Sequence, residues 1–115
     1  MDPYPKNFPT KRGGGWKRRP DLEGTGIAYE YIPGGAIGWA TGRLSASIPA
    51  ATAREAIAWL TERELRTRIV HEGPEVAVII ESDDALRPLK MFEEISSVSG
   101  LESVQPEILM DKSKK

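Results

Sequence analysis

The sequence predicts an α+β fold of the ferredoxin-like type, with the element order β-α-β-β-α-β over residues 42–110. Two segments with apolar residues at helical spacing separate runs in which apolar and polar residues alternate as in strands. The length of 115 residues corresponds to a single domain. Two right-handed crossovers would place both helices on one face of a four-stranded antiparallel sheet and leave the other face open.

The first 41 residues are expected to precede this fold in two parts. Residues 1–23 hold few aliphatic side chains, so burial would return less free energy than ordering costs, and we expect a flexible basic arm. Residues 24–41 are rich in glycine, and the β-branched and aromatic run 27–32 precedes turn residues, which predicts an extra strand or hairpin. Residues 111–115 form a charged tail.

The first half of the predicted fold is a strand followed by a helix. Apolar and polar residues alternate over 43–48, which is the pattern of a half-buried strand, and Pro49 closes it. Thr52 and Glu55 then match a capping box. A helix is therefore expected over residues 53–63.

The second half contains three strands and one helix. Residues 65–70 alternate again, whereas residues 75–81 are apolar on both faces, as in the middle of a sheet. Leucine, phenylalanine and isoleucine recur at helical spacing over 86–95. The last strand is expected over 101–110, at a sheet edge, because Pro106 has no backbone N–H for the ladder.

Composition argues against several classes of enzyme. The absence of cysteine excludes disulfides, thiolate metal sites and cysteine nucleophiles within this chain, and a single histidine excludes a histidine-rich metal site. His71 lies beside Glu72, but no second histidine or nucleophile accompanies them. The glycine runs at 13–15 and 24–26 do not match a phosphate-binding loop. We therefore predict no catalytic residue, no metal site and no cofactor.

The formal net charge of −1 is a balance between two unlike parts of the chain. Residues 1–20 carry six Lys or Arg against one Asp, a net of +5, so the remaining residues sum to −6. The longest weakly polar stretch, residues 31–42, is too short to span a bilayer as a helix. We predict a cytoplasmic protein with no membrane span.

The stretch from Val76 to Met110 carries the pattern of a known family. A strand ends in Glu81, small acidic residues at 82–84 open a helix, and spaced aliphatic residues at 95–101 lead through Gly100 into a closing strand. This pattern resembles the NapD family, small cytoplasmic chaperones of the periplasmic nitrate reductase. The resemblance implies a ferredoxin-like fold and binding of the twin-arginine signal peptide of a molybdenum enzyme before export.

The open sheet face is the predicted binding site. If Leu44 and Leu65 point inward, the alternate side chains of their strands lie on this face, with Trp39 at its rim. The face is expected to bind a peptide or to pair with a second copy of the chain, unless the hairpin of residues 24–42 covers it. An RNA-binding face is disfavoured because strand 75–81 has no aromatic residue. The predicted site residues are Trp39, Ser45, Ser47, Arg66, Arg68 and Val70.

The basic arm is a second candidate surface. Cations next to glycines and one aromatic side chain suit phosphate contact and base stacking, so nucleic acid is one candidate partner. An acidic protein partner is another, and a solvated terminus without a partner is a third interpretation. The expected contact residues are Lys11, Arg12, Trp16, Lys17, Arg18 and Arg19.

These observations favour a non-enzymatic binding or assembly protein. The leading hypothesis is a NapD-like chaperone that recognises a signal peptide or another segment of a redox enzyme. Two alternatives stay open: a small accessory subunit that docks on a larger complex through its N-terminal arm, and an RNA-binding protein that uses the arm. The first alternative rests on Trp16 and Trp39, which lie within Gly/Pro-rich segments.

Overall fold

The computed structural model describes residues 3–9, 13–22, 26–98 and 100–110, and strands make up nearly half of this part of the chain. Its strands are β1 (Asn7–Pro9), β2 (Gly15–Arg18), β3 (Ile27–Ile32), β4 (Ile37–Pro49), β5 (Arg66–His71), β6 (Glu75–Glu81) and β7 (Glu102–Met110). Its helices are α1 (Ala53–Glu62), α2 (Arg87–Lys90) and α3 (Phe92–Ser96), and a 3-10 turn, η1 (Ala50–Thr52), precedes α1.

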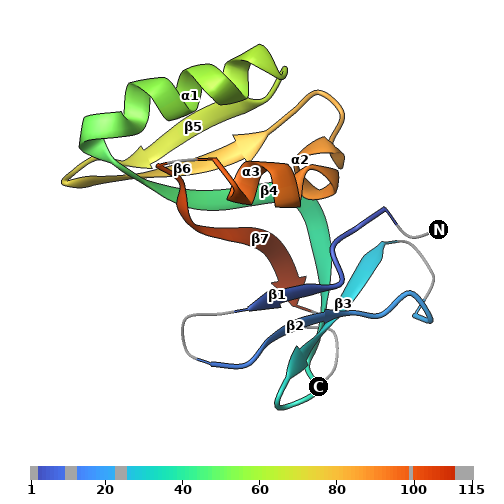
Figure 1. Cartoon of the computed structure of the whole chain (residues 1–115). Helices are drawn as coiled ribbons and strands as arrows, with labels where there is room; N and C mark the ends of the chain where they lie inside the picture. Colours follow the sequence, from blue (N-terminus) through green and yellow to red (C-terminus); the bar gives the residue numbers. More distant parts are fainter. Residues whose placement is uncertain (1–2, 10–12, 23–25, 99, 111–115) are drawn as a thin grey trace.

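All seven strands belong to one antiparallel sheet. The strand order is β1-β2-β3-β4-β6-β5, and β7 pairs with β4 as well (Figure 1). The ferredoxin-like fold predicted over residues 42–110 is wrong, because the sheet has seven strands instead of four and its helices are short. The extra strand expected over residues 27–32 is confirmed as β3, whereas β1 and β2 lie in the segment expected as a flexible arm.

The expected second helix is divided into α2 and α3. Met91 separates them with φ −95° and ψ 14°, and Pro88 lies at the start of α2, where its missing N–H is tolerated. Leu89 and Ile95 are nevertheless fully buried, so the predicted apolar spacing still faces the core.

The first expected helix is confirmed as α1, which buries Ala56 and Leu60 against the sheet. The predicted capping box is wrong, because the Thr52 side chain makes no capping hydrogen bond. Thr52 instead ends the turn η1, and its hydroxyl donates to the carbonyl oxygen of Pro49 at 3.4 Å.

The longest strand, β4, runs without interruption through the boundary expected between residues 41 and 42. Buried and half-exposed residues alternate along its whole length. Gly42 has φ +103°, and a Cβ atom there would collide with the carbonyl oxygen of Ala85. This glycine therefore lets the segment before α2 approach the middle of β4, and the extension and the body share one strand.

Residues 1–23, expected as a flexible arm, contain β1 and β2 in their described part. Phe8 is 0% exposed, and its ring centroid lies 5.1 Å from that of Tyr29 and 4.5 Å from that of Phe92. The Tyr29 hydroxyl donates to the Pro5 carbonyl oxygen at 2.7 Å. The segment has few aliphatic side chains, but its aromatic side chains are buried against residues that are distant in the sequence. The expectation of a flexible arm is therefore wrong for its described part. The expected charged tail, residues 111–115, lies outside the described residues.

Replacing Phe8 with alanine tests whether β1 belongs to the core. Because the ring is fully buried between Tyr29 and Phe92, Phe8→Ala should lower the free energy of unfolding by about 3–5 kcal/mol. Denaturant-induced unfolding followed by fluorescence or circular dichroism gives this value.

Lys17→Ala is the matched control, because Lys17 is exposed in the neighbouring strand and its loss should change stability by less than about 0.5 kcal/mol. Equal stabilities of the Phe8→Ala variant and the parent chain would show that the first strand is not part of the folded core.

Candidate functional site

The sheet face turned away from the helices carries a connected row of charged side chains. The helices α1, α2 and α3 lie on one side of β4, β5 and β6 (Figure 1). Arg43 of β4 is the centre of the row on the other side, with its guanidinium 2.7 Å from Glu107 of β7 and 3.7 Å from Glu81 of β6. Arg68 of β5 lies 3.6 Å from the same Glu81. Four strands are therefore linked by ion pairs across one face.

Glu107 is the most constrained carboxylate in this row. The Thr41 hydroxyl donates to its Oε1 at 2.7 Å, and Arg43 Nε donates to the same oxygen at 2.8 Å. The Thr41 hydrogen bond is the main cause that lowers the pKa of Glu107. Burial opposes it as the second-largest effect, and the hydrogen bond and charge of Arg43 lower the pKa further. The carboxylate is thus held in its charged form.

The four polar residues predicted for the open face lie on β4 and β5. Ser45 and Ser47 alternate with buried residues on β4, and the Ser47 hydroxyl donates to Glu75 Oε1 at 2.6 Å. Arg66 and Arg68 lie on the exposed strand β5, and Arg66 donates to Asp83. The structure therefore brings both arginines to carboxylates of this chain.

The two apolar residues of the predicted site lie apart from the ion pairs. Trp39 is half-buried and pairs across the sheet with Leu109, which is 57% exposed. Val70 lies where the pairing of β5 with β6 shifts, between Ile69 and His71. Sequence reasoning missed Arg43, although it shares a face of the strand with the predicted serines, because nothing in the sequence shows that β6 and β7 lie beside it.

The basic residues expected to act as contacts of the arm are largely engaged within the chain. Arg18 Nη1 donates to the Ala28 carbonyl oxygen at 2.9 Å, and its guanidinium lies 5.5 Å from the ring centroid of Tyr4. Trp16 packs edge-on against Tyr31, with ring centroids 5.3 Å apart. Lys17 is exposed, and Lys11 and Arg12 lie outside the described residues.

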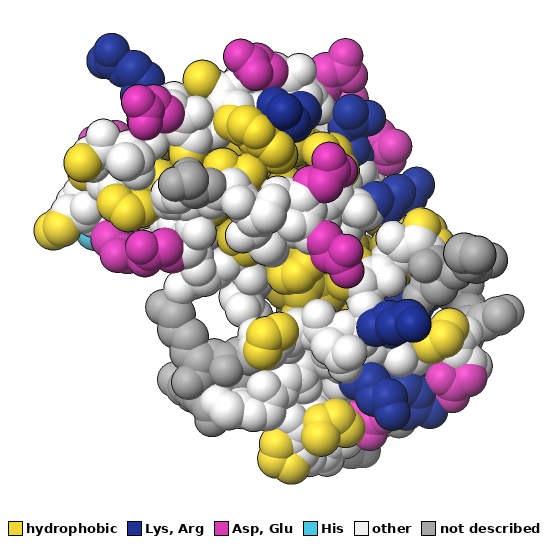
Figure 2. Space-filling view, in the orientation of Figure 1, with side chains coloured by type: hydrophobic (Ala, Val, Ile, Leu, Met, Phe, Trp, Pro, Cys, Tyr) yellow, Lys and Arg dark blue, Asp and Glu magenta, His cyan; other side chains and the backbone are white. Residues whose placement is uncertain are grey.

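Arg19 forms the strongest of these internal contacts. Its guanidinium donates to both oxygens of Asp21, at 2.9 and 2.6 Å, and to Glu30 Oε1 at 2.5 Å. The Arg19 fork lowers the pKa of Asp21 to about 2. Asp21 and Glu30 therefore offset the charge of Arg19 locally. Figure 2 shows basic and acidic side chains close together on the lower part of the molecule.

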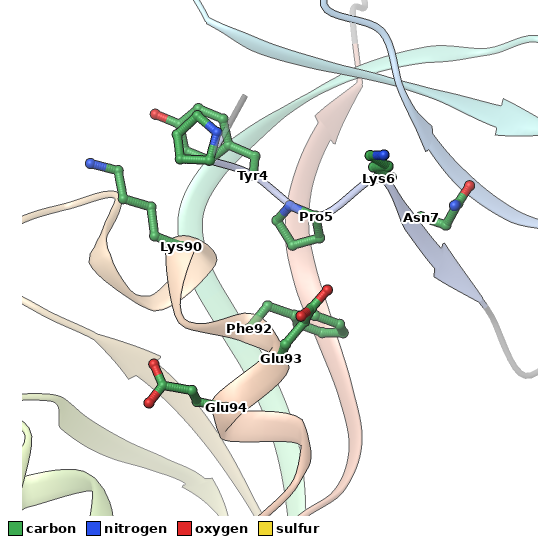
Figure 3. A pocket seen from close by; sticks show the side chains of 9 residues that line it. Tyr4, Pro5, Lys6, Asn7, Lys90, Phe92, Glu93 and Glu94 are labelled. Carbon is green, nitrogen blue, oxygen red and sulfur yellow. The ribbon is translucent and has the colours of Figure 1, made fainter. Parts of the chain in front are cut away.

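A groove separates the N-terminal segment from α2 and α3. It has a volume of about 690 Å³, with Tyr4 and Pro5 on one wall and Lys90, Phe92 and Glu93 on the other (Figure 3). Phe92 lines this groove and also contacts the buried ring of Phe8, so the groove borders the hydrophobic core. The walls carry both signs of charge and define no single ligand.

The outer strand β5 is the described part of the sheet that is most available to another chain. It pairs with β6 alone among the described strands, and five of its six residues are exposed. Ile69 is 46% exposed and Val70 is 54% exposed. Large aliphatic side chains at an unpaired strand edge are a known template for pairing with a further strand.

No family model, curated protein or solved structure matches this chain. In the part of the chain that the structure describes, no group of three His, Asp or Glu residues is arranged to hold a metal ion. No helix in that part is long and apolar enough to cross a membrane. The function must therefore be argued from the geometry of the sheet.

The pH dependence of stability tests the Thr41–Arg43–Glu107 contact. Because the pKa of Glu107 is lowered by folding, its contribution is fully present above the unfolded-state value, about 4.3, and is lost as pH falls through the folded value. Glu107→Gln should therefore cost about 1 kcal/mol at pH 7, since the group is partly screened by solvent.

The free energies of unfolding of the Glu107→Gln variant and the parent chain should converge as pH falls below about 4. Urea unfolding at several pH values measures this convergence. A difference that stays constant from pH 7 to the acid end would show that the charge of Glu107 contributes nothing.

Proposed function

We propose that this chain is a non-enzymatic binding protein that takes up an extended segment of a protein partner along β5. The proposal rests on one observation: β5 is the last strand of its half of the sheet and exposes Ile69 and Val70. Strand addition at such an edge gives affinity through backbone hydrogen bonds and specificity through alternate side chains.

The charge of β5 favours an acidic partner segment. The strand sequence RTRIVH contains Arg66 and Arg68 and no carboxylate. Both arginines are more than half exposed and bind their acidic neighbours at the surface, where such pairs contribute little to stability. A partner strand that alternates aliphatic and acidic residues would pair with Ile69 on one face and with the arginines on the other.

The finer hypothesis, a twin-arginine signal peptide as the partner, stays a prediction. Such a peptide carries two cations and would meet Arg66 and Arg68 with like charge, which disfavours it at this edge. The accessory-subunit and RNA-binding hypotheses also stay predictions. A single titration series distinguishes the acidic segment from the signal peptide.

Three synthetic peptides of about eight residues form that series, one alternating Val and Glu, one alternating Val and Lys, and one twin-arginine signal peptide. The Val/Glu peptide should bind and slow hydrogen exchange at the amides of β5, because strand addition covers the free edge. Arg68→Glu should weaken this binding about tenfold, equivalent to about 1.4 kcal/mol.

Arg54→Glu, on the exposed face of α1, changes the net charge by the same amount and should leave the affinity unchanged. Protection that falls elsewhere in the chain, or tighter binding of the Val/Lys or twin-arginine peptide, would contradict the proposal. Concentration-dependent dimerisation without peptide would instead show that a second copy of the chain occupies the edge.

A further inference from the structure

We propose that a second site, independent of β5, binds the phosphate group of a phosphate monoester. The site is a hollow of about 560 Å³ between the C-terminal end of α1 and the helix α2. Its lining residues are Arg63, Asp84, Arg87, Lys90, Met91 and Glu94. Three cations thus converge from two elements on a space that holds a phosphate and part of the group that carries it.

Arg63 is held in place before any ligand arrives. Its guanidinium carbon lies 3.8 Å from the ring centroid of Trp59, and its Nη1 donates to the Trp59 carbonyl oxygen at 3.0 Å. The ion pair with Glu62, at 3.6 Å, is at the exposed surface. Stacking and a single backbone hydrogen bond leave other N–H donors of the planar guanidinium for an anion.

Arg87 is the cation that the fold leaves unsatisfied. Its Nε is buried and has no hydrogen-bond partner among the described residues. Buried polar atoms are normally paired. The terminal guanidinium nitrogens of Arg87 also have no hydrogen bond or ion pair with a described residue, and these are the donors that an anion in the hollow would contact. Arg87 and Lys90 are three residues apart on α2 and so neighbour each other on its surface. Neither forms an ion pair in the described part of the chain.

The two carboxylates of the lining set the charge balance. Asp84 is turned toward its own backbone, because its Oδ1 accepts the Leu86 N–H at 3.2 Å. The Glu94 carboxylate accepts no hydrogen bond from another described residue, and it would repel an anion. Three cations still exceed two carboxylates, and a phosphate dianion gains more from this excess than a single carboxylate does. Removing the charge of Glu94 should therefore strengthen binding.

Titration of the full chain at constant ionic strength tests the site, with inorganic phosphate, O-phosphoserine and acetate as probes. NMR amide shifts at residues 84–94 should saturate with both phosphate probes and much less with acetate. Arg87→Gln should weaken phosphate binding about tenfold, whereas Glu94→Gln should tighten it about threefold. Arg87→Lys, which keeps the charge and loses the fork, should fall between Arg87→Gln and the parent chain.

Arg54→Gln is the matched control, since it removes one positive charge from the other end of α1 and should not change the affinity. Equal weakening by Arg54→Gln and Arg87→Gln would reduce the effect to general charge and overturn the proposal. Weaker phosphate binding by Glu94→Gln, or acetate affinity equal to that of phosphate, would also overturn it. Thermal unfolding of each variant establishes that the altered chain is folded.

Discussion

The pairing of β4 on both of its edges is the constraint on which the rest of the structure depends. One edge pairs with β3 over Ile37–Ala40 and with β6 over Leu44–Pro49. The other edge pairs with β7 from Gly38 to Ser47. Thirteen residues in one strand thereby pair with three other strands, β3, β6 and β7. Damage to β4 would separate the two halves of the sheet, because the described strands on each side meet through it.

This arrangement also decides which surfaces remain for other molecules. Alternate residues of β4 bury Leu44 and Ile48 beneath the helices, so the opposite face must carry Arg43 and its neighbours into solvent. Carboxylates of β6 and β7 neutralise the charge of Arg43 on that face. The face therefore has little net charge with which to attract a charged ligand. The ends of the structure differ, because β5 has an unpaired edge and the hollow beside α2 has an excess of cations. One proposed site therefore lies at the outer strand of the described sheet, and the other lies at the hollow beside α2.

Patterns over a few neighbouring residues correctly predicted those strands and helices whose ends are set by local sequence. The alternation over 43–48 and the apolar run 75–81 are confirmed as parts of β4 and β6, and α1 begins at the expected residue. The prediction of the fold class was wrong, because the pairing of strands depends on contacts between residues far apart in the sequence. Phe8 enters the core through Phe92, more than eighty residues further along the chain, and no local pattern indicates that contact. The hydrogen bond from Arg43 to Glu107 spans 64 residues and is equally invisible before the strands are paired.

The distribution of cations shows that a count of charges does not by itself show which cations are available to a ligand. The count makes the basic residues 11–19 one candidate binding surface. Yet Arg18 and Arg19 bind a carbonyl oxygen, aromatic rings and two carboxylates of the same chain, because β2 and β3 bring these groups together. Arg87 and Lys90 are unremarkable in the sequence, but on the short helix α2 neither forms an ion pair with another described residue. A cation is available to a ligand when the fold leaves it unpaired, and this depends on tertiary geometry rather than on local charge density.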